Sequence, residues 1–290
     1  MNAHAKPAVP AGLVDDLGPR HKHALMTPEV VGSDLLTRGL RDAQHRGRSV
    51  EPVERHLVER LAVVDEVVHR VEMRALTRGI HQFTTRLRDR PDPWMYHVFA
   101  PLHRLRGRTF AIVGLGRIGI ATALRAKALG MDVAFYDPYR QDGFDKSLGI
   151  RRVESIEDLF RQAFVLSLHC PLTDETRALV NADTLELLPR GAFLVNTARG
   201  GVVDTSALPA ALASGRLAGA GIDVLPQEPP ASDDPLLVAW RDRSHPAFER
   251  LIVNPHAAFY SEEGLLDMRV KGTDACRRAL LGQPLRNVVN

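Results

Sequence analysis

The sequence predicts an α/β protein built on a doubly wound parallel sheet, and two observations carry this prediction. The first is that short apolar runs alternate with helical or turn-rich segments over the second half of the 290-residue chain. Continuous apolar strands joined by helices are typical of a parallel sheet that is covered on both faces. The second is a glycine-rich turn between the first of these runs and the helix that follows it.

The predicted strands all lie after Arg108, with the predicted helices between them. The strands are the runs TFAIVG, DVAFYD, FVLSLHC, GAFLVNTA, GAGIDV and LIVNPH. The helical or turn-rich segments are IGIATALRAKALG, SIEDLFRQ, NADTLELL and TSALPAALASG. This alternation predicts a Rossmann-type domain, in which a ligand binds outside the carboxyl ends of the strands.

The N-terminal part has a different composition. None of the aromatic residues (10 Phe, 4 Tyr, 2 Trp) lies before Phe83, whereas seven of the 12 histidines do. The first 50 residues show only broken periodicity, which predicts a weakly ordered or loosely packed region. Apolar residues from Val53 to Val71 recur at spacings of three and four, which predicts an amphipathic helix. We favour packing of this helix on its own domain over a partner-binding or dimer helix. The later stretch PDPWMYHVFAP predicts a structured loop.

Composition and charge exclude several protein classes. Hydrophobic residues make up 44% of the chain and charged residues 25%, and no apolar run is long enough to span a membrane. The net charge is only +3 with both signs interleaved, so we attribute the basic balance to solubility and expect no direct nucleic-acid binding. Cys170 and Cys276 cannot form a disulfide framework, and the N-terminus lacks a signal-peptide pattern, so we expect a cytoplasmic protein. No HExxH or CxxC motif is present, and we expect no metal site.

A dinucleotide site is predicted at the first strand, where the turn reads Gly114-Leu115-Gly116-Arg117-Ile118-Gly119. The glycines allow a tight turn, a close approach of backbone to pyrophosphate, and close packing of helix on strand. The helix N-terminus presents free N–H groups to the anion. Strand, turn and helix occur in the required order, which makes the motif more specific than glycine spacing alone.

Asp137 indicates which dinucleotide binds. It ends the second predicted strand, 18 residues after Gly119. A carboxylate at this place accepts from the ribose 2′-hydroxyl of NAD and repels the 2′-phosphate of NADP. The alternative is a turn-forming residue before Pro138. Arg140 would soften the cofactor preference.

Three polar residues follow later predicted strands and are candidates for chemistry. These are Arg199 after GAFLVNTA, Glu228 after GAGIDV, and His256 after LIVNP. A guanidinium holds a carboxylate through two parallel hydrogen bonds, and an imidazole exchanges protons near neutral pH. Taken singly, we favour a blander role for each: a surface charge for Arg199, a turn residue before Pro229 for Glu228, and a hydrogen-bonded loop histidine for His256.

Several stretches together resemble the D-isomer-specific 2-hydroxyacid dehydrogenase family. They are RLRGRTFAIVGLGRIG, FYDPY, HCPLTDET, LVNTARGGVVD, GIDVLPQEPP and NPHAAFYSEE. The versions HAAFYSEE and PLHRLRGRT resemble the C-terminal-binding-protein branch most. The resemblance extends from about Pro101 to the C-terminus and, more weakly, from Asp65.

The resemblance implies a role for each candidate. Arg199 matches the arginine that binds the carboxylate and carbonyl of the substrate. Glu228 matches the carboxylate that orients the histidine, and His256 matches the general acid/base. Arg199 and His256 also match positions that contact the cofactor. Further implied cofactor contacts are Cys170, Pro171, Thr176, Thr197, Ala198 and Asp223, in addition to the glycine turn with Arg117 and Ile118.

The N-terminal part departs from the family. Members carry an N-terminal substrate domain, and residues 1–64 resemble none of it. Arg70, Glu72 and Arg74 interrupt the junction helix, which is largely apolar in the family. We therefore expect an incomplete or atypical substrate domain. The predicted parts are an atypical, poorly ordered region (1–64), a junction helix and loop (65–100), an NAD-binding domain (101–260) and a C-terminal helix that returns to the N-terminal region (261–290).

The function that these observations predict is NAD(H)-dependent hydride transfer to or from a small D-2-hydroxy acid and its 2-keto acid. We expect a homodimer, and we expect activity to be impaired by the atypical N-terminal region, because closure of two domains positions the substrate and excludes water. The alternatives are a non-enzymatic NAD(H)-binding interaction protein that resembles a corepressor, or an inactive truncated dehydrogenase.

Overall fold

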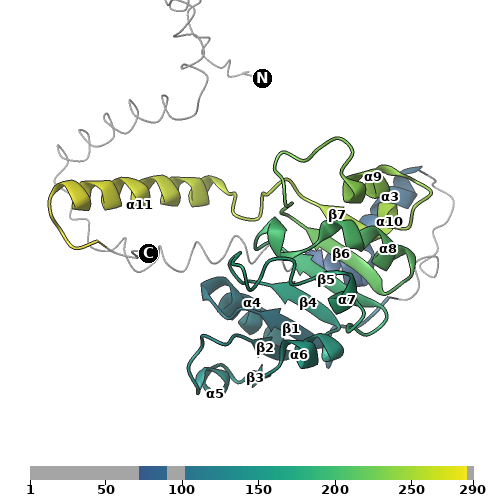
Figure 1. The fold of residues 1–290 in the computed structure, drawn as a ribbon, viewed down its shortest axis with the longest axis horizontal. Coiled ribbons are helices and arrows are strands. Elements are labelled where there is room, and N and C mark those ends of the chain that lie inside the picture. Colours follow the sequence, from purple (N-terminus) through teal and green to yellow (C-terminus); the bar gives the residue numbers. More distant parts are fainter. Residues whose placement is uncertain (1–71, 90–101, 286–290) are drawn as a thin grey trace, which may run out of the picture. The chain divides into compact units, whose positions relative to one another are not determined.

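A seven-stranded parallel sheet forms the centre of the computed structural model, which describes residues 72–89 and 102–285 (Figure 1). The strand order is β3-β2-β1-β4-β5-β6-β7. The strands are β1 (Thr109–Val113), β2 (Asp132–Tyr136), β3 (Arg151–Arg152), β4 (Val165–Leu168), β5 (Ala192–Asn196), β6 (Leu217–Ile222) and β7 (Leu251–Val253). The chain winds outward in both directions from β1 and β4, which confirms the doubly wound fold.

All six predicted apolar runs contain strands, and among the strands of the described residues β3 was not predicted. It consists of Arg151 and Arg152, which pair with Ala134 and Phe135 at the edge of the sheet. An edge strand needs few buried side chains, so it leaves no apolar run in the sequence.

Helices occupy the four segments predicted between strands, and others occur where no periodicity was visible. The helices are α3 (Ile80–Asp89), α4 (Arg117–Ala128), α5 (Phe144–Leu148), α6 (Ile156–Gln162), α7 (Ala182–Leu185), α8 (Leu208–Ala213), α9 (Pro235–Arg241), α10 (Ala247–Arg250) and α11 (Glu262–Leu280), with 3₁₀ turns η3 (Gly200–Val202) and η4 (Thr205–Ala207). Residues 72–78 are also helical. The unpredicted α5 and α10 are each a single short turn, below the length at which a helical pattern can be recognised.

The core has two layers, one on each face of the sheet. Along β1, Ala111 and Val113 face one hydrophobic cluster, while Phe110 and Ile112 face the other. The first cluster is closed by buried residues of α6, α7, α8, α9 and α10. The second is closed by α4 and by the helical residues Met73 and Leu76. Two-sided burial explains why these strands are apolar throughout rather than alternating.

The helix of residues 72–78 packs across β6 on glycines. A Cβ on Gly219 would lie 3.0 Å from Leu76, and one on Gly221 would lie 2.9 Å from Glu72. One helical turn from Glu72 to Leu76 rises about 6 Å, close to the roughly 6.6 Å between alternate strand residues. Helix and strand therefore run in opposite directions, and Glu72 lies toward the carboxyl end of β6.

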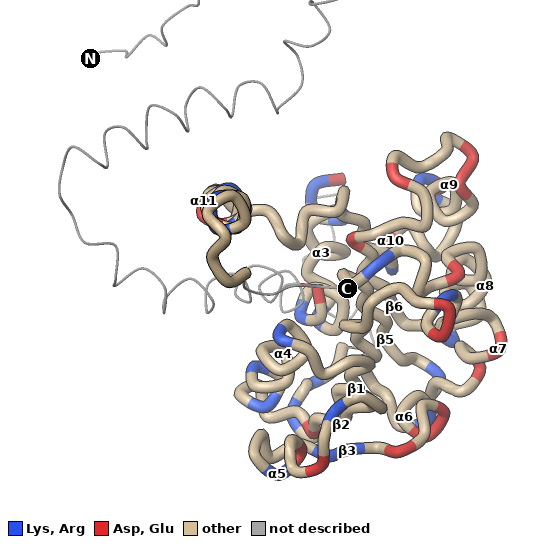
Figure 2. The backbone as a smooth tube through the Cα atoms, turned by 60° about the vertical axis from the view of Figure 1, so that its left-hand side comes forward, with Lys and Arg blue, Asp and Glu red and all other residues tan. Residues whose placement is uncertain are grey.

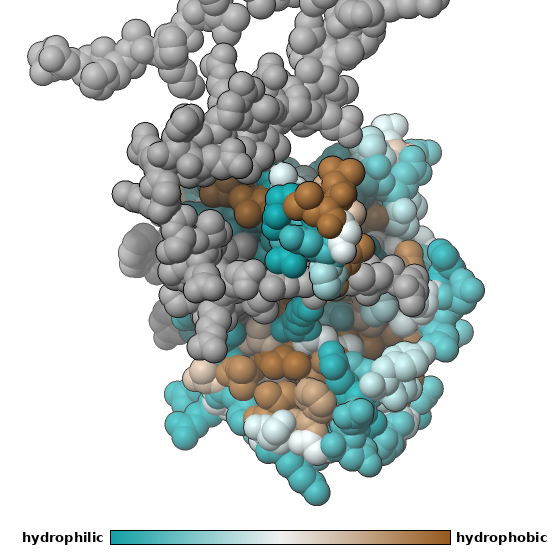
Figure 3. All heavy atoms as spheres, turned by 90° about the vertical axis from the view of Figure 1, so that its left-hand side faces the viewer, coloured by the Kyte–Doolittle hydropathy of each residue, from teal (hydrophilic) through white to brown (hydrophobic). Residues whose placement is uncertain are grey.

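The helix α11 carries exposed apolar side chains at Leu266, Met268 and Val270. Ser261 caps its first turn by accepting from the Gly264 N–H at 2.8 Å. On the face of the molecule drawn in Figure 3, hydrophobic and hydrophilic surface are interspersed over the described residues. Return of this segment to the N-terminal region stays a prediction.

Acidic and basic residues are interspersed along the elements in the described part of the chain (Figure 2). Within residues 72–89 and 102–285, no helix is long and apolar enough to cross a bilayer. The predicted helix from Val53 to Val71, the loop of residues 91–101 and the character of residues 1–64 lie outside the described ranges.

Candidate active site

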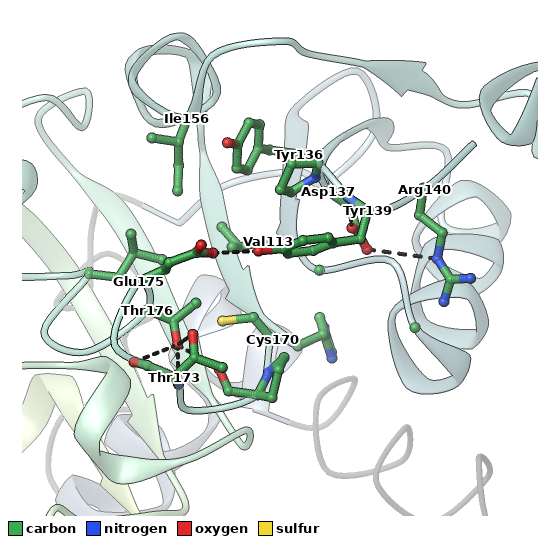
Figure 4. Close-up of a pocket in the computed structure, with 16 residues that line it drawn as sticks. Val113, Tyr136, Asp137, Tyr139, Arg140, Ile156, Cys170, Thr173, Glu175 and Thr176 are labelled. Atoms are coloured by element: carbon green, nitrogen blue, oxygen red, sulfur yellow. Dashed lines mark hydrogen bonds and ion pairs between the residues drawn. The ribbon is translucent and has the colours of Figure 1, made fainter. Parts of the chain in front are cut away.

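A cavity of about 630 Å³ lies at the carboxyl ends of β1, β2 and β4 (Figure 4). This is the place where an open α/β sheet binds its ligand, at the point where the strand order reverses. Six of the predicted cofactor residues line it: Gly114, Gly116, Asp137, Cys170, Pro171 and Thr176. The structure therefore brings together residues from three separate predicted strands.

The glycine turn has the shape that dinucleotide binding requires. Gly114 has φ +89°, and a Cβ on it would lie 2.8 Å from the Cys170 backbone nitrogen. A Cβ on Gly119 would lie 2.3 Å from the Gly114 carbonyl oxygen, so only glycine lets α4 pack this close to β1. Gly116 differs, because a Cβ there would meet nothing within 4 Å. Gly116 is also the N-cap of α4 and makes no side-chain cap, so the first-turn N–H groups of the helix have no capping side chain.

Arg117 and Ile118 begin α4 directly after this N-cap. Neither is among the residues that line the cavity. Their backbone N–H groups belong to the first turn of the helix, where the dipole favours an anion.

Asp137 is held in place by the backbone on both sides. Its Oδ2 accepts from the Leu115 N–H in the glycine turn at 2.7 Å, and its Oδ1 accepts from the Tyr139 N–H at 3.0 Å. Arg140 places Nε 3.7 Å from Oδ2. The carboxylate is thus fixed at the rim of the cavity, with a guanidinium beside it.

Tyr139 and Glu175 are among the lining residues of this cavity that were not predicted from the sequence. The Tyr139 hydroxyl donates to Glu175 Oε2 at 2.5 Å, and Figure 4 shows the two side chains pointing toward each other across the cavity. This hydrogen bond to Glu175 raises the pKa of Tyr139, which keeps the hydroxyl protonated. The two residues are 36 positions apart, so no local pattern could have paired them.

Cys170 and Thr176 form part of the cavity wall. Burial raises the pKa of the Cys170 thiol to about 11, and the charge of Asp137 adds to this effect. The thiol is therefore neutral and behaves as a small apolar group. The Thr176 hydroxyl donates to the Pro171 carbonyl at 2.6 Å and closes the turn between them.

Thr197, Ala198 and Arg199 lie in the loop after β5 and do not line this cavity. The loop is shaped by Asn196, which is fully buried. Its Oδ1 accepts from the Ala198 N–H at 3.1 Å, and its Nδ2 donates to the Arg199 carbonyl at 3.1 Å. Asn196 was not singled out from the sequence, although its place at the end of a buried strand is a signal for such a role. Arg199 donates from Nη1 to the Ala198 carbonyl at 2.6 Å and is exposed.

Glu228 and His256 form a hydrogen-bonded pair. Glu228 Oε2 lies 2.7 Å from His256 Nδ1, and Glu228 Oε1 accepts from the Leu225 N–H at 2.8 Å. Burial raises the pKa of Glu228, but the hydrogen bonds from His256 and Leu225 and the nearby charges of His256 and Arg199 outweigh it and lower the pKa. Glu228 is therefore ionised at neutral pH, and an ionised carboxylate fixes Nδ1 of the imidazole as a donor.

Asp223 holds the loop that carries His256. We call residues 254–258 the His256 loop. The carboxylate of Asp223 accepts from the Ala257 N–H at 2.8 Å and from the Ala258 N–H at 3.0 Å, while its carbonyl accepts from the His256 N–H at 2.7 Å. His256 itself has φ +51°, a left-handed backbone that non-glycine residues seldom adopt. The three hydrogen bonds to Asp223 maintain this conformation.

The Phe259 ring lies edge-on to the His256 imidazole, with centroids 5.7 Å apart, and was also not predicted. Phe259 is 40% exposed. In the described ranges, no group of three or more His, Cys, Asp or Glu side chains is arranged to hold a metal ion.

Comparison with known proteins agrees with this geometry. The family model described as D-isomer specific 2-hydroxyacid dehydrogenase, NAD binding domain, matches residues 71–258. The chain is 46% identical over 157 residues to a glyoxylate reductase from Korarchaeum cryptofilum, which covers 54% of this chain and 44% of that protein. It is 35% identical over 192 residues to C-terminal-binding protein 1 from Caenorhabditis elegans, which covers 64% of this chain and 25% of that protein.

A solved structure shares the fold. It is a D-lactate dehydrogenase from Aquifex aeolicus in complex with NAD and lactic acid, with a TM-score of 0.66 and 27% identity. The match covers 76% of this chain and 66% of that one. The chain thus spans less than half the length of the two relatives matched by sequence, and the shared part contains the nucleotide-binding fold.

Proposed function

This chain belongs to the D-isomer-specific 2-hydroxyacid dehydrogenase family, and on that premise we propose that it interconverts a small D-2-hydroxy acid and its 2-keto acid with NAD(H). The observation that carries the proposal is the pair of His256 and Glu228, 2.7 Å apart, with the charge of Arg199 acting on the same carboxylate. All three follow strands of the sheet at the edge where the dinucleotide-type cavity lies. An acid/base, its orienting group and a carboxylate-binding cation are what this reaction requires.

The residues of the chain divide the chemistry between them. Arg199 binds the carboxylate of the substrate with its planar guanidinium. Glu228 accepts a hydrogen bond from Nδ1 of His256. This leaves Nε2 to donate a proton to the substrate oxygen or to accept one from it. When bound, the nicotinamide cofactor supplies or accepts the hydride. Asn196 acts indirectly, because it holds the loop that carries Arg199, and Asp223 in addition holds the loop that carries His256.

The cofactor would lie along the cavity from Asp137 to the glycine turn. The open space at Gly116 and the uncapped start of α4 fit a pyrophosphate, and the fixed carboxylate of Asp137 fits a ribose diol. Cys170, Pro171 and Thr176 would form the opposite wall. We further propose that Thr197 and Ala198 contact the nicotinamide half, together with Asp223, Arg199 and His256.

A steady-state assay tests this function. NADH oxidation would be followed with the full chain against glyoxylate, hydroxypyruvate, pyruvate and phosphohydroxypyruvate, with His256→Asn as the matched control. We expect oxidation with at least one of these acids and a much lower rate in the variant. The proposed activity is refuted if the full chain oxidises NADH no faster than His256→Asn does with each of the four acids.

A second candidate is an NAD(H)-binding interaction protein without enzymatic activity. The observation that favours it is the 35% identity to C-terminal-binding protein 1 over 192 residues. NADH binding in a fluorescence titration, combined with no turnover in the assay above, would support this candidate over the enzyme. The homodimer, the cytoplasmic location and the effect of residues 1–64 on activity stay predictions.

A further inference from the structure

Glu72 is a buried carboxyl group that the proposed chemistry does not use. It lies on the helical segment of residues 72–78 and is 2% exposed. Its carboxyl group packs against the backbone of Gly221, near the carboxyl end of β6. Glu72 is thus a carboxyl group with almost no exposure to water. Burying one is costly and calls for a compensating role.

The Glu72 side chain is hydrogen-bonded to the His256 loop. The Asn254 Nδ2 donates to Glu72 Oε1 at 2.6 Å, while Oε2 has no hydrogen-bond partner in the described part of the chain. Asn254 is the first residue of the loop and also donates its backbone N–H to the Ile222 carbonyl at 3.0 Å. Glu72 therefore holds one end of the loop, while Asp223 holds the other through Ala257 and Ala258.

The charges around Glu72 indicate which protonation state of its carboxyl group is stable in this buried position. Burial, together with the charge of Asp223, raises the pKa of Glu72 to about 8, although the Asn254 hydrogen bond lowers it in part. Among the described residues, Asp223 is the charged group that acts on Glu72 from the elements packed against it. The negatively charged carboxylate of Asp223 accepts hydrogen bonds from two N–H groups of the loop. A neutral Glu72 accepts from Asn254 without placing a second negative charge beside Asp223.

We propose that Glu72 is a positioning residue for His256, which in its neutral form ties the His256 loop to the helix of residues 72–78. This inference rests on the proposed function only in giving His256 a catalytic role. Opening of the loop exposes Glu72 to water and lets it ionise, so opening releases a proton. By linkage, the closed loop is most stable at low pH and is weakened as the pH rises from about 4.5 to about 8.

Hydrogen exchange of the loop tests this proposal without cofactor or substrate. The protection of the Ala257 and Ala258 amides, corrected for intrinsic exchange, would be measured by NMR from pH 5 to pH 9. In the natural chain we expect protection to fall by up to roughly tenfold per pH unit, and to level off above about pH 8. In Glu72→Gln, which is neutral at every pH and retains an acceptor for Asn254, the fall should be much smaller.

Two further variants complete the experiment. Glu249→Gln removes a carboxylate that also ties the N-terminal helices to the domain, through Arg86 at 2.6 Å, and should keep the natural pH dependence. Asn254→Ala removes the donor and should lower protection at every pH. The proposal is overturned if protection in the natural chain does not change with pH, or if Glu72→Gln shows the same fall as the natural chain. Since no turnover is measured, absence of enzymatic activity would refute the proposed function and leave this result standing.

Discussion

Glu228 and His256 are 28 positions apart in the chain, yet Oε2 of Glu228 lies 2.7 Å from Nδ1 of His256. The second oxygen of Glu228 is occupied by the Leu225 N–H, so the carboxylate cannot rotate without losing a hydrogen bond. On the other side, His256 is fixed by its left-handed backbone and by the Asp223 carbonyl. The imidazole is therefore oriented before any substrate binds.

Replacement of His256 tests its role in proton transfer. In His256→Asn we expect turnover to fall by roughly 10²-fold to 10⁴-fold, the usual contribution of general acid/base catalysis. Asparagine tolerates the left-handed backbone at this position, so the loop should keep its shape. NADH affinity, measured by fluorescence titration, should remain largely intact. Unchanged turnover would remove His256 from the mechanism.

Replacement of Glu228 by Gln removes a charge and keeps the size of the side chain. The hydrogen bonds that lower the pKa of Glu228 keep it ionised at neutral pH, where its charge stabilises the imidazolium of His256. Without that charge the imidazolium that forms during proton transfer is less stabilised, so kcat/KM should fall. An unchanged kcat/KM in Glu228→Gln would contradict the pairing.

The carboxylate of Asp137 is expected to set the cofactor preference. The natural chain should bind NADH more tightly than NADPH, because a 2′-phosphate would meet the negative charge of Asp137. Asp137→Ala should narrow this difference, since it removes the charge and leaves Arg140 nearby. Asp132→Ala, at the exposed start of the same strand, is the control and should leave the ratio of the two dissociation constants unchanged. Equal affinities in the natural chain would refute the assignment.

Two glycines of the same turn should respond differently to alanine. Gly119→Ala places a Cβ 2.3 Å from the Gly114 carbonyl oxygen, so α4 must move and the unfolding temperature should fall. Gly116→Ala meets nothing within 4 Å, so the unfolding temperature should stay unchanged while the added methyl weakens NADH binding. Calorimetry and NADH titration of both variants separate the two effects. Unchanged NADH affinity in Gly116→Ala would place the pyrophosphate elsewhere.

Much of the fold was predictable because its signals are local. A strand buried on both faces must be apolar at successive positions, as in Phe110 to Val113, and a helix N-terminus close to a strand requires glycine at position 119. The strands at the centre of the sheet were predicted for this reason. The edge strand β3 and the short helices α5 and α10 were not, because they bury few side chains of their own.

The tertiary structure alone decided which polar side chains meet. The sequence determined that Asp137, Arg199, Glu228 and His256 each follow a strand, and parallel strands bring such residues to one edge of the sheet. It did not determine that Tyr139 bonds to Glu175 across the cavity, or that Asn196 and Asp223 hold the loops behind Arg199 and His256. In the sequence, Glu72 interrupts the predicted junction helix. Its role depends on its contacts with Gly221 and Asn254, about 150 and 180 residues away. The periodicity of a sequence shows which side chains a single helix or strand buries. These contacts join different elements, and the sequence separation of two elements does not predict their distance in space.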